Sequence, residues 1–365
     1  MRILHLADRL TDRGGAYTWM LGIVEGLSND HEQRLVVGED PGEVRPGCPV
    51  VVRPGLESRV PQALALDDLV ADFRPDVIHV HNVVNPLVLE WASARRGALV
   101  TVQDHRFFCP TRGKWTLAGE VCRRPLSREV CASCFEDQAY FEEVMALSER
   151  RLAAVRKLRV SVLSRYMREE LVAAGVGAAS IHVVPPFVHH LDPEAAADGP
   201  ACVLFVGRLV EAKGVREAVK AWRRSGVNLP LVLAGTGPLR AELEAQAAAE
   251  KEGPALEVLG WVERSRLSAL YQRARAVLFP SRWQEPFGIV GIEALSFGVP
   301  VVAWESGGVG EWHPGPGLVR WGDTPALARA LTKAVGRRLL LLPRFDRDEA
   351  IGRLTAVYAR ARAGN

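Results

Sequence analysis

The chain has 365 residues, of which 48% are hydrophobic and 24% are charged, and its formal net charge is +3. This length favours two domains over a single core, and this composition excludes a disordered or low-complexity protein. The small net charge argues against a nucleic-acid-binding protein, and no apolar run is long enough to cross a membrane. The first residues already read as an apolar strand rather than a signal peptide, so we expect a cytoplasmic protein.

The first half of the chain alternates apolar runs with segments of helical spacing, as parallel α/β sheets do. A strand over 2–7 is followed by Gly14 and Gly15 and then by a helix over 17–27. A glycine pair between a strand and a helix typically faces a phosphate or an acceptor, because the helix start presents free N–H groups. Further strands are predicted over 33–37, 50–53, 77–81, 98–103, 160–163 and 181–184.

Two histidines close the predicted strand over 77–81. His79 and His81 are two positions apart, so their side chains leave the same face of the strand. They could form a metal-binding pair. We favour a simpler interpretation, in which one histidine is buried and the other lines a cleft at the end of the strand.

Four cysteines follow in a loop-like segment, with the spacing C-x12-C-x8-C-x2-C formed by Cys109, Cys122, Cys131 and Cys134. The final C-x2-C is a metal-knuckle spacing, and four thiolates suit tetrahedral zinc. An iron–sulfur cluster, a disulfide pair and four ordinary buried thiols are the alternatives. We expect structural zinc, which would hold a basic insertion over about 109–134 above an acceptor site.

A basic helix and a polar linker end the first half. The arginines of a helix over 138–157 could contact an anionic membrane or a diphosphate-linked acceptor, although a solvated face is the simpler interpretation. The polar segment 189–200 is bounded by proline and glycine, which indicates an interdomain linker. We therefore place an N-terminal domain over 1–190, a C-terminal domain over 200–343 and a last helix over 344–365 that returns to the first domain.

The second half opens with the same strand-to-helix arrangement. After an apolar strand, Arg208 and Lys213 stand at the start of a helix. Arginine offers bidentate hydrogen bonds and lysine a point charge, which suits a diphosphate at the carboxyl end of a strand. Gly235 and Gly237 form another loop that a ligand can approach closely. Strands are predicted over 201–206, 231–234, 256–260, 276–280 and 301–303, and helices over 327–335 and 344–362.

The stretch SRWQEPFGIVGIEALSFGVP at 281–300 joins two carboxylates to a helix start. Glu285 and Glu293 are eight residues apart, a little over two helical turns, so both can face one side. Pro286 suits the first turn of that helix, and Gly288 and Gly291 let a ligand approach the backbone closely. Because their neighbours are mostly apolar, the two glutamates interrupt a packed surface and need partners. The arrangement predicts a site for a polyhydroxylated, phosphate-bearing ligand.

The segment EPFGIVGIE resembles the E-x7-E motif of the retaining GT-B glycosyltransferases of family four, which use nucleotide sugars. The run from Gly207 to Gly214 resembles that family's GRL-x3-KG motif for the donor diphosphate. The resemblance extends over most of the chain and implies an α/β protein of GT-B fold, with two doubly wound Rossmann-like domains facing a cleft. It also implies transfer of a hexosyl unit from a nucleoside diphosphate sugar to an acceptor with retention and without a catalytic metal.

The resemblance also implies roles for individual residues. Catalytic roles fall to Glu285, Lys213, Arg208 and Asp104. The donor would be bound by Gly14, Gly15, Gly235, Gly237, Trp261, Phe287, Gly288, Ile289, Val290 and Glu293. His81 and His105 would lie on the acceptor side. The family often has His-Asp-Tyr where this chain has Gln103, Asp104 and His105, a departure from the family pattern.

Two alternatives remain at this point: a nucleotide-sugar epimerase on the same fold and a catalytically inactive GT-B binding subunit. The joint presence of Arg208, Lys213, Glu285 and Glu293 argues against the second. The expected partners are a nucleoside diphosphate sugar and an acceptor that is a saccharide, a lipid-linked saccharide, a natural product or a peptide. No nucleic acid is expected, and peripheral contact with the inner face of a membrane is one option.

Overall fold

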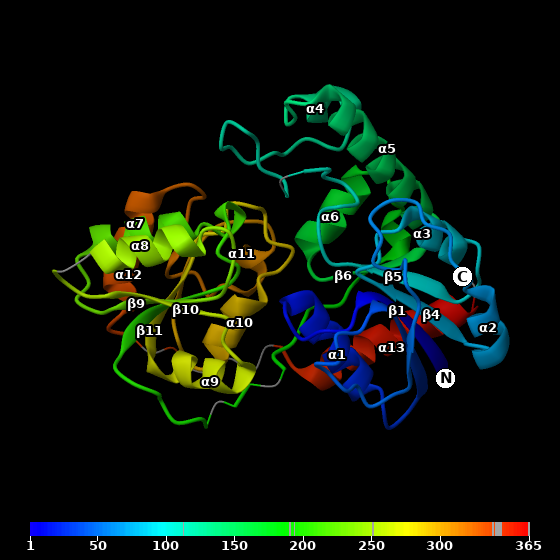
Figure 1. Cartoon of the computed structure of the whole chain (residues 1–365), viewed down its shortest axis with the longest axis horizontal. Helices are drawn as coiled ribbons and strands as arrows, with labels where there is room; N and C mark the ends of the chain where they lie inside the picture. Colours follow the sequence, from blue (N-terminus) through cyan, green and yellow to red (C-terminus); the bar gives the residue numbers. More distant parts are fainter. Residues whose placement is uncertain are drawn as a thin grey trace. The chain divides into compact units, whose positions relative to one another are not determined.

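Two parallel sheets, each in its own compact unit, organise the chain (Figure 1). The computed structural model describes residues 1–111, 113–189, 191–192, 194–249, 252–337, 339 and 345–363. Unit 1 comprises Met1–Leu117, Cys122–His189 and Asp346–Asn365, and unit 2 comprises Ala118–Val121 and His190–Phe345. The linker predicted over 189–200 includes His190 and Pro193, which lie outside the described residues.

Unit 1 is built on a seven-stranded parallel sheet with the order β3-β2-β1-β4-β5-β6-β7. The strands are β1 Arg2–Arg9, β2 Glu32–Glu39, β3 Val50–Val52, β4 Val77–His81, β5 Ala98–Val102, β6 Arg159–Val162 and β7 Ile181–Val183. The helices are α1 Gly15–Gly26, α2 Asp67–Phe73, α3 Pro86–Ser93, α4 Arg128–Ala132, α5 Gln138–Val155, α6 Arg165–Ala173, the 3-10 turn η1 Ala178–Ser180 and α13 Arg347–Ala363. The strand order reverses between β1 and β4, where open α/β sheets bind ligands at the carboxyl ends of their strands.

The last helix, α13, packs on the sheet of unit 1 beside α1, although unit 2 precedes it in the sequence. Figure 1 shows this red helix next to the blue helix α1. Leu354 and Tyr358 of α13 are fully buried, and the Tyr358 hydroxyl forms a 2.7 Å hydrogen bond with Nδ1 of His79 on β4. The end of the chain thus contributes both apolar and polar contacts to the core of unit 1.

Unit 2 is built on a six-stranded parallel sheet with the order β10-β9-β8-β11-β12-β13. The strands are β8 Cys202–Val206, β9 Leu231–Ala234, β10 Leu256–Gly260, β11 Ala274–Phe279, β12 Val301–Trp304 and β13 Leu318–Val319. The helices are η2 Glu211–Lys213, α7 Val215–Ser225, α8 Arg240–Ala249, α9 Arg264–Arg273, α10 Ile289–Ser296, α11 Val309–Trp312 and α12 Thr324–Ala334. Here the order reverses between β8 and β11, and the loops after these two strands carry the predicted donor site.

The predicted α/β class and the two doubly wound sheets are confirmed. Every predicted strand is present, with ends that shift by one or two residues at most. Buried parallel strands are nearly continuous apolar runs, which is why the sequence identifies them so well. The sequence does not predict the helices α2, α3, α4, α8, α9 and α11 or the two-residue strand β13, because short elements have too few residues to show a clear apolar pattern.

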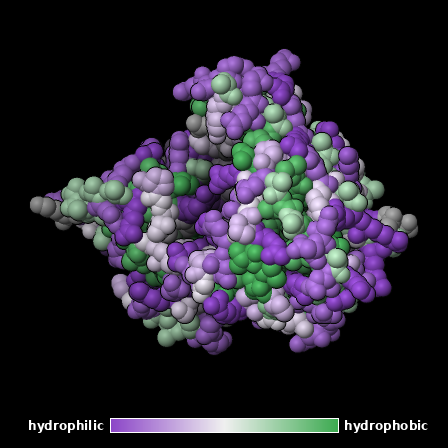
Figure 2. Space-filling model, turned by 45° about the vertical axis from the view of Figure 1, so that its right-hand side comes forward, coloured by the Kyte–Doolittle hydropathy of each residue, from purple (hydrophilic) through white to green (hydrophobic). Residues whose placement is uncertain are grey.

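Hydrophilic residues dominate the face of the molecule in Figure 2, with smaller hydrophobic patches among them. Among the described residues, no helix combines the length and the apolar character needed to cross a bilayer. The arginines of α5 are engaged within unit 1. Arg150 pairs with Glu90 of α3, and the buried Arg151 donates to the carbonyl of Val84 (2.7 Å). These contacts favour a structural role for these two arginines over a membrane-facing one.

Candidate functional site

Two loops of unit 2 are tied together at the carboxyl ends of neighbouring strands. The loop after β8 carries Lys213, and the loop after β11 carries Glu285. The carbonyl of Ala212 accepts hydrogen bonds from the backbone N–H groups of Arg282 (2.9 Å) and Trp283 (3.1 Å). These bonds hold one loop on the other and bring together two side chains that are 72 residues apart in the sequence.

Lys213 and Glu285 form an ion pair in this place. Nζ of Lys213 lies 2.7 Å from Oε1 of Glu285, and the buried Ser281 hydroxyl donates to the same oxygen. Glu285 is only 3% exposed. Burial lowers the pKa of Lys213, and the adjacent carboxylate partly offsets that effect. The pair places the Lys213 and Glu285 side chains in direct contact at a largely buried position.

An aromatic ring that the sequence does not single out lies beside this pair. The Lys213 ammonium lies 4.3 Å from the centre of the Trp283 ring, and the guanidinium carbon of the exposed Arg208 lies 5.7 Å from it. A cation over an indole face is attracted by the ring quadrupole. The ring therefore holds the two predicted diphosphate-binding cations near each other.

A third loop fixes the backbone of Glu285. It follows β12, and the N–H of Gly308 donates to the carbonyl of Glu285 (2.8 Å), while the N–H of Gly307 donates to Oε1 of Gln284 (2.9 Å). Gly307 has φ +53°, and a Cβ there would overlap the backbone of Glu285. Glycine is required at this position for the two loops to meet.

The helix after Glu285 begins later than predicted. Gly288 adopts a left-handed conformation with φ 95°, and α10 starts at Ile289. The prediction that Pro286 occupies the first helical turn is therefore wrong. Glu285 precedes the helix while Glu293 lies within it, so helical spacing does not place the two carboxylates on one side.

The start of α10 leaves two backbone N–H groups without an intrahelical partner and packs against Trp312. By helix geometry the N–H groups of Ile289 and Val290 have no intrahelical acceptor. Phe287 is buried, and its carbonyl accepts a 2.5 Å hydrogen bond from Nε1 of Trp312. A Cβ on Gly291 would overlap the indole of Trp312, so this glycine serves packing rather than the predicted approach of a ligand.

Glu293 has two partners on α9 that the sequence does not reveal. Arg264 donates to Oε1 (3.0 Å), and the hydroxyl of Tyr271 donates to Oε2 (2.9 Å). Burial raises the pKa of Tyr271 well above its usual value, and the Glu293 carboxylate adds to that rise. Tyr271 therefore stays a hydrogen-bond donor, and the two contacts set the orientation of the carboxylate.

The glycines of the β9 loop meet backbone as well. A Cβ on Gly235 would overlap the carbonyl of Gly207, and one on Gly237 would overlap that of Leu209. The loops after β8 and β9 are thus in direct backbone contact. Trp261, which follows β10, is 41% exposed and so presents part of its ring at the surface.

In unit 1, Gly14 and Gly15 stand at the start of α1 as predicted. Gly14 caps the helix with φ 127°, and its carbonyl accepts a hydrogen bond from the N–H of Tyr17 (3.0 Å). The hydroxyl of Tyr17 donates to Oδ2 of Asp8 (3.0 Å), whereas the buried Oδ1 has no hydrogen-bond partner among the described residues. Burial raises the pKa of Asp8. Asp8 was not predicted, and its one signal is a carboxylate that interrupts the end of an apolar strand.

Asp104 follows β5 and is engaged with its own loop. It accepts hydrogen bonds from the N–H (2.8 Å) and Nε (2.7 Å) of Arg106. Burial alone would raise the pKa of Asp104, but the Arg106 guanidinium outweighs it and holds the pKa below the usual value. The same guanidinium offsets part of the rise that burial causes in the pKa of Asp8, so the two acids share one cation. His105 is buried, with Nε2 3.3 Å from the Tyr166 hydroxyl.

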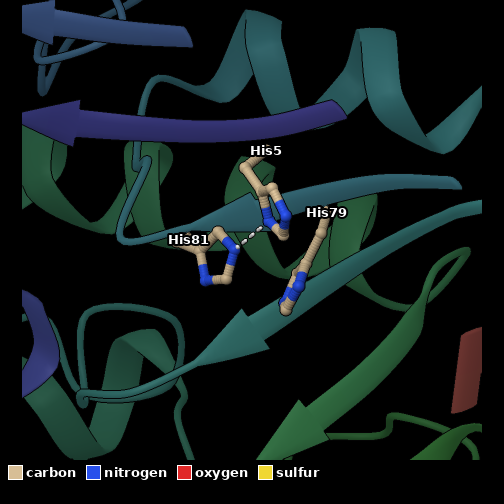
Figure 3. A group of neighbouring side chains, drawn as sticks. All are labelled: His5, His79 and His81. Carbon is tan, nitrogen blue, oxygen red and sulfur yellow. Dashed lines mark hydrogen bonds between the residues drawn. The ribbon is translucent and has the colours of Figure 1, made fainter. Parts of the chain in front are cut away.

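Three histidines meet in the core of unit 1 (Figure 3). His5 of β1 and His79 and His81 of β4 are fully buried, and their potential ligand atoms lie within 4.8 Å of one another. Nδ1 of His5 lies 3.0 Å from Nε2 of His81 in a hydrogen bond. Nδ1 of His81 has no partner among the described residues. We call these residues the histidine trio.

Hydroxyl and amide groups occupy the other ring nitrogens of the trio. Nε2 of His5 bonds Oε1 of Gln33 (3.0 Å), and the two nitrogens of His79 bond the hydroxyls of Tyr358 (2.7 Å) and Thr101 (2.6 Å). A metal ion would have to displace several of these bonds. The geometry therefore favours a hydrogen-bonded core network over the metal pair considered from the sequence.

Burial lowers the pKa values of the histidine trio and keeps its side chains away from the surface. It lowers the pKa of His5 to about 4 and holds the pKa values of His79 and His81 well below the ordinary range. All three imidazoles are thus neutral at physiological pH. The expectation that His81 lines a cleft is wrong in this structure, because its side chain is 0% exposed.

The four clustered cysteines all lie in unit 1, between the end of β5 and the start of α5. Each is half-buried and none forms a disulfide. The predicted residues thus fall into separate groups, with Arg208, Lys213, Glu285 and Glu293 in unit 2 and Asp104, His105 and the cysteines in unit 1.

Two family profiles match the chain. The "Glycosyl transferase 4-like domain" matches residues 14–186, and "Glycosyl transferases group 1" matches residues 190–313. The D-inositol 3-phosphate glycosyltransferase of Xylanimonas cellulosilytica is 31% identical over 324 residues, which cover 78% of this chain and 72% of that protein. The glycogen synthase of Mycobacterium tuberculosis is 40% identical over 116 residues, 31% of this chain, and the match spans only 28% of the synthase.

The chain also resembles solved structures along its whole length. The crystal structure of HepE from Anabaena in complex with UDP and glucose aligns with a TM-score of 0.69 at 19% identity. The alignment covers 99% of this chain and 100% of that one. Together with further glycosyltransferase structures, this likeness confirms the predicted GT-B fold.

Proposed function

Because this chain belongs to the glycosyl transferases group 1 family, we propose that it transfers a hexosyl unit from a nucleoside diphosphate sugar to an acceptor with retention of configuration. The observation that carries the proposal is the buried Lys213–Glu285 pair, with Arg208 and Trp283 beside it, where the strand order of unit 2 reverses. The crystal structure of the similar HepE contains UDP and glucose, which supports a nucleotide-sugar donor.

Departure of the nucleoside diphosphate is the step that this site is suited to assist. The leaving diphosphate gains negative charge as the glycosidic bond breaks. Arg208, Lys213 and the N–H groups at the start of α10 are positive or hydrogen-bond donating, and they are held in place before the donor arrives. Preorganised groups of this kind stabilise developing charge without reorganising during the reaction. They would supply the charge that a divalent metal supplies in other enzymes, so we propose catalysis without a metal.

The two glutamates would bind the uncharged parts of the donor. Glu285 would accept hydrogen bonds from hydroxyls of the sugar, and Glu293 from hydroxyls of the ribose. A carboxylate offers about four lone-pair sites, so Glu293 keeps acceptor capacity beyond its bonds to Arg264 and Tyr271. These two α9 residues would orient Glu293 rather than compete with the nucleoside.

Lys213 would change partners when the donor binds. Without a donor its ammonium neutralises the buried carboxylate of Glu285. A diphosphate near Arg208 would share that ammonium, while sugar hydroxyls would satisfy the carboxylate. Removing Lys213 therefore has two costs: a lost phosphate contact and a buried carboxylate without its cation.

Donor binding is the first test of the proposal. Thermal-shift screening of the full chain against diphosphate sugars of uridine, guanosine, adenosine and thymidine should reveal one preferred donor. Lys213→Ala and Glu285→Gln should each lower affinity for that donor by about 10-fold or more, since a charge-assisted contact contributes about 1.5–3 kcal/mol. Lys220→Ala, on the exposed face of α7, and Glu305→Gln, also exposed, are the matched controls.

Product analysis decides the reaction. Nuclear magnetic resonance of the product should show the same anomeric configuration as the donor. Conversion of the donor alone to an epimer would favour the epimerase, and failure to bind any nucleotide sugar would favour an inactive binding subunit. Unchanged donor affinity in Lys213→Ala would contradict the assigned site.

A further inference from the structure

We propose that Cys109, Cys122, Cys131 and Cys134 bind one zinc ion through four thiolates, at a structural site of unit 1 that is separate from the donor site. The proposal does not depend on the proposed glycosyl transfer. It rests on the backbone around the cysteines, on their spacing and half-buried free thiols and on the charge of the surrounding segment.

The first two cysteines are joined through Lys114. The N–H of Lys114 donates to Sγ of Cys109 (3.3 Å), and the carbonyl of Lys114 accepts from the N–H of Cys122 (2.9 Å). Gly113 and Lys114 both have left-handed backbone conformations, with φ 70° and φ 64°. A non-glycine residue in this region is strained by about 1 kcal/mol or more and persists only where its surroundings hold it. The chain thus curls around the sulfur of Cys109 and directs a backbone donor at it.

The other two cysteines lie on and just after the short helix α4. The hydroxyl of Ser127 caps this helix by accepting from the N–H of Val130 (3.1 Å), and the N–H of Cys131 bonds the Ser127 carbonyl (2.9 Å). The N–H of Cys134 then bonds the carbonyl of Cys131 (3.0 Å). This turn brings the C-x2-C pair together in the manner of a metal knuckle.

The two pairs belong to one short segment of unit 1. Cys109 and Cys134 are 25 positions apart, and all four thiols are half-buried and free of disulfides. Among the described residues only the histidine trio has three potential ligand atoms within 4.8 Å of one another. A zinc ion, with Zn–S bonds of about 2.3 Å, would therefore draw the four sulfurs closer than they lie here.

The charge of the segment suits a tetrathiolate. Zinc with four thiolates has a net charge of about −2. Lys114 is buried, and its ammonium pairs with Glu170 (2.9 Å) and donates to the carbonyl of Arg124 (2.6 Å). Arg123 and Arg124 follow Cys122 directly. The N–H of Lys114 that points at the sulfur of Cys109 is the kind of hydrogen-bond donor that supports a metal-bound thiolate.

The remaining cysteines serve as an internal contrast. Cys48 and Cys202 lie elsewhere in the fold, and Cys202 is fully buried. Neither has another cysteine near it in the sequence. Soft thiolate ligands select zinc, whereas the nitrogens of the histidine trio are already used by hydrogen bonds.

A zinc ion would give this segment the cross-link that its own packing lacks. Between the end of β5 and the start of α4, the described residues contain no regular helix or strand, and the buried apolar side chains are few, chiefly Phe107, Phe108 and Trp115. Four thiolates fill the tetrahedral shell, so no position remains for water and the ion is structural. The site would fix the loop after β5 beside His105 and Tyr166.

Metal content of the full chain tests the proposal. Protein purified without added metal should contain about one zinc per chain by elemental analysis, and a mercurial reagent should release it as the thiols react. The double variant Cys131→Ser with Cys134→Ser should lose the zinc, while Cys48→Ser should retain it. Hydrogen exchange over 109–134 should rise when the wild-type protein is stripped of metal. Cobalt substituted into wild-type protein should give the intense visible absorption of a tetrahedral thiolate site.

The spectrum and the mercurial titration keep the test decisive even if the double variant does not fold. Folded wild-type protein without metal would overturn the proposal. Iron and inorganic sulfide in the purified protein would show an iron–sulfur cluster instead of zinc. Four oxidised cysteines that do not react with the mercurial would show disulfides instead. Zinc retained in the double variant, or lost in Cys48→Ser, would show that these four cysteines are not the ligands.

Discussion

Acidification should weaken unit 1, because folding buries the histidine trio in its neutral form. Burial lowers the pKa of His5 from 6.5 to about 4 and lowers the pKa values of His79 and His81 in the same direction. The unfolded chain regains the ordinary values and so binds more protons below about pH 6.5. The stabilisation is therefore complete above that pH and is lost progressively as the pH falls towards the folded-state values.

The size of the effect follows from His5 alone. Between pH 7 and pH 5, a shift from 6.5 to about 4 removes about 2 kcal/mol of unfolding free energy, and the loss approaches about 3 kcal/mol below pH 4. His79 and His81 add to the loss with the same sign. Because a domain is stable by about 5–15 kcal/mol, this is a substantial fraction of the total.

Urea unfolding at pH 7 and at pH 5 measures the loss of unfolding free energy. Pulse hydrogen exchange, followed in peptides from β1 and β4, assigns that loss to unit 1. His5→Gln should be less stable at pH 7, because it loses the contacts to His81 and Gln33. Its loss on acidification should nevertheless be smaller by about 2 kcal/mol than that of the wild type. His31→Gln, outside the trio, is the control. An equal loss in wild type and His5→Gln would refute the reasoning.

Three further outcomes are expected. Gly291→Ala should destabilise unit 2 by about 1–3 kcal/mol in a thermal or urea melt, because its Cβ overlaps Trp312, whereas Gly310→Ala, with open space around it, should not. Tyr358→Phe should cost about 1 kcal/mol of unit 1 stability by losing the hydrogen bond to His79, and an unchanged melt would count against that bond. Turnover should persist during a brief assay in EDTA, and a complete loss that magnesium alone restores would contradict metal-free catalysis.

The sequence was a good guide to the backbone and to the motifs at strand ends. Parallel strands such as β4 and β11 are buried on both faces, so each appears as an uninterrupted apolar run whatever the rest of the chain does. In doubly wound sheets the loops after such strands meet at one edge, which is why Arg208, Lys213 and Glu285 could be assigned to one site before any contact was seen.

Local pattern failed where one glycine changed the backbone. The spacing of Glu285 and Glu293 predicts one continuous helix, but the left-handed Gly288 delays its start to Ile289. Glycine has no Cβ, so it can adopt a left-handed or a right-handed backbone conformation. Its surroundings in the fold decide between the two. Gly291 shows the same limit, since its neighbour Trp312 comes from a different helix.

Partners of buried polar groups were decided by the tertiary structure alone. His5 meets His81 from another strand, His79 meets Tyr358 from the last helix, and Glu293 meets two residues of α9. Burial of apolar side chains does not require a particular partner, so the local apolar pattern is enough to specify the strands. The sequence by itself therefore determines the strands and the α/β class. A buried hydrogen bond needs one donor and one acceptor about 3 Å apart with the right orientation, and only the packing of distant segments fixes that geometry.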